Sequence, residues 1–248
     1  MSNDNDGERS SRDVAKITPE PMAASATVGS VRTGIRSYFS TAWLRAGIKF
    51  SDEARVIEAQ HRGGPNSDPI HRAFVIASIQ AAVAFMEANV NELYQDAADG
   101  HGTEGDGYVA PLPEATRWSM SEVWQGTGDG RKLEALSKYQ LMLTTAGLPT
   151  LDRGVHPYQD AAAVTRLRNV LVHYQPETIF ADESNRLESQ LKDKFSDNKM
   201  LAGSGNAWWP SRCLGAGCCD WAISSVRSLA DHVANNLGIT PNYKRQGL

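Results

Sequence analysis

Apolar residues recur at intervals of three and four along most of the chain, which is the spacing of one buried face of an α-helix. This pattern predicts helices over residues 31–61, 71–98, 114–124, 133–146, 160–174, 187–195 and 217–237. Stretches rich in glycine, proline or small polar residues separate several of them, at 62–69, 99–113, 126–130 and 197–214. No segment alternates apolar and polar residues over the length of a strand, so the sequence predicts an all-α fold.

The predicted helices indicate one domain with two short appendages. Residues 1–30 are rich in Ser, Asn, Asp, Ala and Gly, and such a segment buries too little apolar surface to offset the entropy of ordering. We therefore expect a flexible N-terminal tail over 1–30, a helical domain over 31–240 and a C-terminal tail over 241–248. Within the domain, the apolar stripe over 71–98 predicts the central core helix.

The helix predicted over 160–174 has the clearest boundaries. Asp160 is a suitable N-cap, and Pro176 disfavours helical geometry at the residue before it. Val164, Leu167, Leu171 and Tyr174 define its buried stripe. The loop before it, 148–159, carries Arg153 and His156, which we expect beside the mouth of any site on this helix, with simple solvation as the alternative for His156.

The polar residues of this helix form a second face. Arg166, Asn169 and His173 are spaced by three and four positions, so they lie on one side of the helix. Arg168 is five residues before His173, about 140° around the helix, but its long stem can return the guanidinium to that face. A fixed cation, an amide and a group that titrates near neutral pH are suited to binding and cleaving a phosphodiester. The alternative is that Arg168 and His173 only pair with acidic residues of neighbouring helices, for which Glu87 and Glu92 are candidates.

The segment from Arg168 and Asn169 to His173 resembles the Arg-Asn-x-x-x-His signature of HEPN domains (higher eukaryotes and prokaryotes nucleotide-binding). Residues 73–94 and 218–230 resemble the first core helix and the last helix of a bacterial branch of that family. The resemblance covers about residues 35–240 and is clearest over 133–177. It implies an antiparallel helical bundle with additional helices, and many members are metal-independent ribonucleases that work as dimers.

The resemblance implies catalytic roles for Arg168, Asn169 and His173, with Arg166 and Tyr174 binding RNA or supporting the site. RNA cleavage without a metal proceeds when the ribose 2′-hydroxyl attacks the adjacent phosphorus, and this requires a base, an acid and positive charge. A homodimer would supply two imidazoles. We therefore expect an endoribonuclease, as a toxin or defence effector, with an antitoxin-type protein as a possible partner. Two alternatives remain open: a non-catalytic module that binds RNA or a nucleotide, and a structural protein with internal salt bridges.

Composition limits these hypotheses further. The net charge of −4 argues against a non-specific nucleic-acid binder but leaves room for a local basic patch. Three cysteines, two of them adjacent, fit a reducing compartment, so we expect a cytoplasmic protein without a signal peptide. We found no apolar run of membrane-spanning length, no zinc-ligand spacing and no phosphate-binding glycine loop, and so expect no membrane association, metal or cofactor. For Trp208 and Trp209, packing against the end of the bundle is favoured over stacking on bases.

Overall fold

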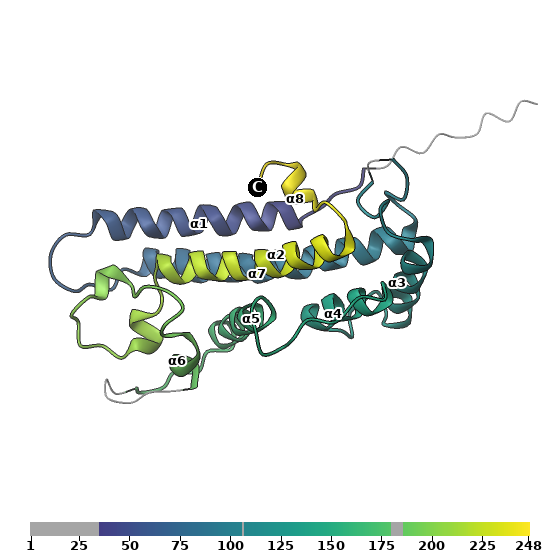
Figure 1. The fold of residues 1–248 in the computed structure, drawn as a ribbon. Coiled ribbons are helices and arrows are strands. Elements are labelled where there is room, and N and C mark those ends of the chain that lie inside the picture. The colour runs from purple at the N-terminus through teal and green to yellow at the C-terminus, as the bar shows by residue number, and fades with distance from the viewer. Residues whose placement is uncertain (1–34, 106, 180–185) are drawn as a thin grey trace, which may run out of the picture. The chain divides into compact units, whose positions relative to one another are not determined.

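The computed structural model describes residues 35–105, 107–179 and 186–248, and all the regular structure in these ranges is helical (Figure 1). The all-α prediction is therefore confirmed for the described residues. Ser37–Leu248 form a compact unit of their own. The helices are α1 (Ser40–Gln60), α2 (Pro69–Asp99), α3 (Glu114–Gly126), α4 (Ala135–Thr145), α5 (Tyr158–Val172), α6 (Arg186–Leu191), α7 (Ala216–Leu237) and α8 (Asn242–Arg245), with short helical turns at η1 (Lys199–Leu201) and η2 (Trp208–Arg212).

Helix α2 is the centre of this unit. It packs along α1 and also contacts α3, α4, α5 and α7 (Figure 1). Its start is fixed by Asp68, whose carboxylate accepts hydrogen bonds from the backbone amides of Ile70 and His71, and by Pro69 at the first helical position. It ends at Gly100, which adopts the left-handed conformation that favours glycine. The sequence prediction of a core helix here is confirmed.

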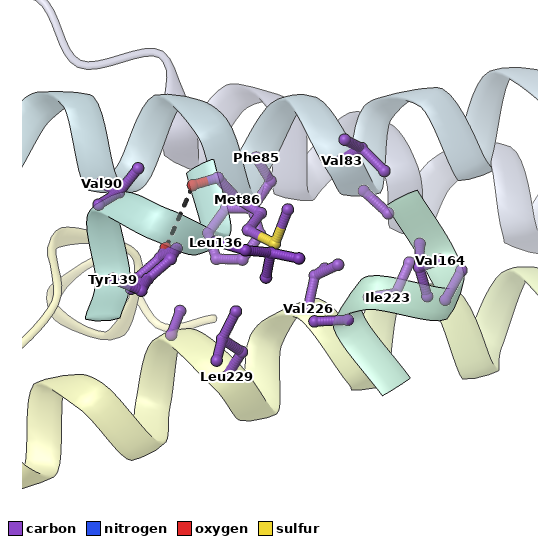
Figure 2. Packing of buried hydrophobic residues seen from close by; sticks show 14 of the residues in the cluster. Val83, Phe85, Met86, Val90, Leu136, Tyr139, Val164, Ile223, Val226 and Leu229 are labelled. Carbon is purple, nitrogen blue, oxygen red and sulfur yellow. Dashed lines mark hydrogen bonds between the residues drawn. The ribbon is translucent and has the colours of Figure 1, made fainter. Parts of the chain in front are cut away.

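The core lies where α2, α4, α5 and α7 meet. Figure 2 shows Met86 of α2 close to Leu136 and Tyr139 of α4, with Val226 and Leu229 of α7 on the other side. These side chains are buried, and the Tyr139 hydroxyl donates a hydrogen bond to the backbone carbonyl of Met86 at 3.1 Å. A buried hydroxyl without a partner would be costly, so this bond lets a large polar ring contribute to the core.

Several predicted details are wrong. Trp118 was expected to face the core with Trp124, but its side chain is 65% exposed, whereas that of Trp124 is buried. Residues 241–248 were expected to be a tail, but they contain α8, whose Tyr243 is fully buried. The helix predicted over 187–195 ends at Leu191. The predicted N-terminal tail, residues 1–30, lies outside the described residues.

Helix α2 also bears on the expectation that no segment could span a membrane. Among the described helices it is the one that is long and apolar enough to do so, with a mean hydropathy of 1.6 over its best 18-residue window. Length and composition alone do not distinguish a membrane span from a core helix. In this fold 56% of that window is buried against other helices, and the core helix of a soluble protein commonly has the same properties.

Trp208 and Trp209 pack inside the unit rather than on its surface. Both are almost fully buried, the Trp208 indole donates to a carboxylate oxygen of Asp197 at 2.7 Å, and Phe195 stacks on the Trp208 ring. Buried rings cannot stack on the bases of a nucleic acid. The packing interpretation of this aromatic pair agrees with their burial.

Candidate functional site on helix α5

Helix α5 is held against the core by its apolar stripe. Ala161, Val164 and Leu167 are fully buried, and the helix contacts both α2 and α7. The opposite face, which carries the polar residues, is therefore directed away from the core. The spacing of apolar residues correctly predicted the burial of Val164 and Leu167. Leu171 is only partly buried, and Tyr174, predicted in the same stripe, is exposed because the helix ends before it.

The predicted boundaries of α5 need correction. Asp160 is not the N-cap, because the helix begins at Tyr158 and Pro157 occupies the capping position. The Asp160 carboxylate instead accepts hydrogen bonds from His156 Nδ1 at 2.9 Å and Lys194 Nζ at 2.6 Å. The helix ends at Val172, so His173 is the C-cap residue, with its backbone amide bonded to the carbonyl of Asn169.

The environment of Asp160 shifts its acidity. Burial alone would raise the pKa of this carboxyl group, but the hydrogen bonds from Lys194 and His156 outweigh it and hold the pKa below its ordinary value of 3.8. Asp160 therefore remains ionised at neutral pH. It joins the loop before α5 to the segment after α6.

Three of the predicted site residues are brought together. Arg166, Asn169 and His173 are exposed and border one open hollow of about 400 Å³ at the carboxyl end of α5. Tyr174, 43% exposed, also lines it, together with Gln175 and Glu177. Within the described residues, the imidazole of His173 makes no hydrogen bond or ion pair. A ligand can therefore approach it from solvent.

Arg168 does not join this group. Its guanidinium donates to a carboxylate oxygen of Glu87 on α2 at 2.5 Å, and it lines a separate, largely apolar hollow with Trp43, Phe50 and Val172. We expected the long side chain to return to the face of His173. It extends the other way because an opposite charge lies beside it on α2. Of the two acidic partners proposed from the sequence, Glu87 is used, whereas Glu92 accepts hydrogen bonds from Ser40.

Sequence reasoning missed the residues that surround Arg166. Its guanidinium donates to the side-chain carbonyl of Gln190 on α6, and it borders a second hollow that also contains Arg153 and Lys194. Gln190 and Lys194 are more than 20 residues from Arg166 in the chain. No local spacing connects them, so only the packing of α6 beside α5 could reveal this neighbourhood.

The arrangement offers cations, amides and an imidazole rather than a set of metal ligands. No group of three His, Cys, Asp or Glu side chains that could hold a metal ion occurs within residues 35–105, 107–179 and 186–248. Cys213, Cys218 and Cys219 are buried thiols, and burial raises the pKa of each of them. Their thiolate forms are therefore disfavoured at neutral pH.

In comparisons with known proteins, the chain matches no family model, no curated protein and no solved structure.

Proposed function

We propose that this protein is a metal-independent endoribonuclease of HEPN type, built on a HEPN-like antiparallel helical bundle. The observation that carries the proposal is the exposure of Arg166, Asn169 and His173 around one open hollow. A cation, an amide and an imidazole on the surface of one helix can contact the phosphate and the ribose of a bound strand. The resemblance of the segment 168–173 to the HEPN signature supports the same reaction.

In the proposed reaction, the ribose 2′-oxygen bonds to phosphorus while the bond from phosphorus to the 5′-oxygen breaks. A base takes the proton of the 2′-hydroxyl, and an acid gives a proton to the departing 5′-oxygen. His173 supplies one of these functions. Asn169 and Arg166 donate hydrogen bonds to the phosphate oxygens, where negative charge increases in the transition state. The products are a 2′,3′-cyclic phosphate and a 5′-hydroxyl end.

The position of Arg168 modifies the roles inferred from the resemblance. A phosphate at Arg168 would have to compete with the carboxylate of Glu87, which already lies 2.5 Å from the guanidinium. We therefore assign the phosphate contact to Arg166, and to Arg168 the role of orienting α5 against α2. Arg166→Gln is expected to reduce cleavage more than Arg168→Gln does.

One imidazole cannot readily act as base and acid in the same step. A two-fold dimer that faces one α5 with its copy would place two His173 side chains at one phosphate. We propose such a homodimer in the cytoplasm, acting as a toxin or defence effector with an antitoxin-type protein as partner. If the dimer is the active form, cleavage activity per chain falls when the protein concentration is lowered below the dissociation constant of the dimer.

A second candidate function is a HEPN-like module that binds RNA or a nucleotide without cleaving it. The separation of Arg168 from the hollow of His173 favours this candidate, because it leaves one fewer cation for the transition state. The two candidates make the same prediction for binding and opposite predictions for cleavage.

The test is incubation of purified protein with RNA in EDTA. The wild type is expected to shorten the RNA, and His173→Ala is expected to leave it intact. The matched control is His101→Ala, which removes an exposed histidine in the turn after α2 and is expected to cleave like the wild type. Equal RNA patterns from wild type and His173→Ala would exclude the nuclease, and retained binding would then support the second candidate.

A further inference from the structure

A second hollow, of about 480 Å³, lies beside the first on the same side of α5. It is formed by the loop before α5, by α5 and by the segment from α6 onward. Its polar side chains are Arg153, Gln159, Arg166, Ser189, Gln190 and Lys194. Each of these six side chains can donate a hydrogen bond, and the other two lining residues are Ala162 and Ala163. Such a lining suits an oxygen-rich anion.

The charges of this hollow are unbalanced. Three cations line it, and within residues 35–105, 107–179 and 186–248 the carboxylate that contacts them is that of Asp160, which binds Lys194. Arg166 is oriented by a neutral partner, the side chain of Gln190. Arg153 is exposed, and among the described residues it has no ion pair. At least two positive charges therefore remain available to a ligand.

Arg166 belongs to both hollows. It is seven residues before His173 on α5, which is about 10 Å along the helix axis at ~1.5 Å per residue. The second hollow continues from Arg166 toward the start of α5, at Gln159 and Arg153. The two hollows thus follow one another along the helix, with a shared arginine between them. A small anion would occupy only one of these hollows, whereas an extended strand would occupy both.

We propose that the hollow of Arg153, Arg166 and Lys194 binds a second phosphodiester of the same single-stranded RNA, more than one nucleotide from the one that reacts at His173. This inference rests on the proposed function, because it assumes that RNA lies over α5. The substrate is then an unpaired strand of several nucleotides, since a single base step cannot reach from His173 to Arg153. Phosphate contacts position a strand without reading its sequence, so this subsite serves affinity and register.

The experiment uses the full chain with His173→Ala as background, so that bound RNA stays intact. Binding of a labelled RNA hexamer of mixed sequence is measured by fluorescence anisotropy in EDTA at several salt concentrations. Adding Arg153→Gln is expected to weaken binding and to reduce the salt slope by about 0.7, the value for one lost phosphate contact on a single strand. Arg153→Lys should keep most of the affinity, because it keeps the charge.

The matched control is Arg131→Gln, an exposed arginine between α3 and α4 that lines neither hollow. It is expected to bind like the background protein. A competing dinucleotide, with one phosphate, should bind the Arg153→Gln and Arg131→Gln proteins equally. Equal hexamer affinity and salt slope in these two proteins would overturn the subsite, even if the wild type cleaves RNA. If hexamer binding depends on Arg153 but the wild type does not cleave RNA, the subsite proposal stands and the nuclease proposal is wrong.

Discussion

At the scale of single residues, two arginines of α5 that are two positions apart have different surroundings. Arg168 meets Glu87 of α2, and Arg166 meets Gln190 of α6. Helical geometry predicted that they point in different directions, about 160° apart on the wheel at 3.6 residues per turn. It could not predict their partners, because these come from distant parts of the chain. The pair with Glu87 is therefore the first contact whose contribution should be measured.

Arg168→Gln is expected to lower the free energy of unfolding by about 0.5–1 kcal/mol. The value is small because the ion pair is partly exposed, with side-chain exposures of 25% for Arg168 and 47% for Glu87. Denaturant unfolding checks it, with Arg131→Gln as control. If the Arg168→Gln and Arg131→Gln proteins are equally stable, the ion pair does not tether α5 to α2.

Asp160→Asn tests the carboxylate that links the loop before α5 to the segment after α6. At pH 7 this change is expected to cost about 1–3 kcal/mol, because Asp160 is largely buried and accepts hydrogen bonds from Lys194 and His156. The pKa of Asp160 is lower in the folded state, so its contribution is present above pH 3.8 and is lost as the pH falls through the folded-state pKa. Unfolding at pH 7 and pH 3 measures this difference.

The stability gap between wild type and Asp160→Asn should therefore narrow in acid. Glu122→Gln, at an exposed position of α3, is the control and should differ little from the wild type at either pH. A gap that stays constant or widens on acidification would show that Asp160 acts through its shape rather than its charge.

At the scale of elements, the beginning of α1 depends on α2. The N-cap Phe39 offers no side-chain hydrogen bond, and the carboxylate of Glu92 instead accepts from the backbone amide and the hydroxyl of Ser40, at 2.8 and 2.5 Å. The sequence pattern predicted a helix from residue 31, but the described residues 35–39 are not helical and α1 begins at Ser40. A cap supplied by another helix leaves no local signal, so neither this start nor the role of Glu92 was predictable.

Glu92→Ala is expected to destabilise the protein by about 1–3 kcal/mol, because it leaves the buried amide and hydroxyl of Ser40 without acceptors. Glu92→Gln should cost less, since its amide oxygen can still accept one of the two bonds. Hydrogen exchange at the first turn of α1 locates the effect. An Ala variant as stable as the Gln variant would contradict this account of the cap.

At the scale of the whole molecule, the C-terminal segment completes the core. Tyr243 of α8 is fully buried, its ring packs edge-on against Phe85 at 5.1 Å between centroids, and its hydroxyl donates to Asp231 at 2.7 Å. The sequence suggested a mildly basic tail because α8 is too short to show periodicity. The tertiary environment, not local propensity, makes this segment helical.

Tyr243→Ala is expected to lower the free energy of unfolding by about 3–5 kcal/mol, the range for removing a large buried aromatic ring. Tyr243→Phe should cost about 1 kcal/mol, because it keeps the ring and loses one hydrogen bond. Thermal or denaturant unfolding measures both variants. If the Ala variant loses no more than the Phe variant, α8 is not part of the folded core.

The buried side of α7 and the exposure of the α5 polar face were predictable, because both follow from spacing within one segment. The buried side of α1 was not, because it consists mainly of small or polar residues such as Ser40, Gly47 and Ser51. That Arg166 shares the face of His173 also follows from spacing. The pairing of Arg168 with Glu87 and of Arg166 with Gln190 does not, since these partners are distant in the chain. The same holds for Trp118, which has the composition of a core residue but lies on the outer side of α3. Sequence spacing thus predicted which residues of α5 share a face, and packing against α2 and α6 determined the partners of its two arginines.

We propose that RNA bound on the exposed face of α5 is cleaved when the RNA's own ribose 2′-hydroxyl attacks the adjacent phosphorus. The direct measurement is mass spectrometry of the fragments formed in EDTA from an RNA oligonucleotide and from one with a single 2′-deoxyribose at the main cleavage position. The account predicts 2′,3′-cyclic phosphate ends from the RNA, no cleavage at the deoxy position and no fragments with His173→Ala. Cleavage at the deoxy position, or the same fragments from the His173→Ala protein, would contradict it.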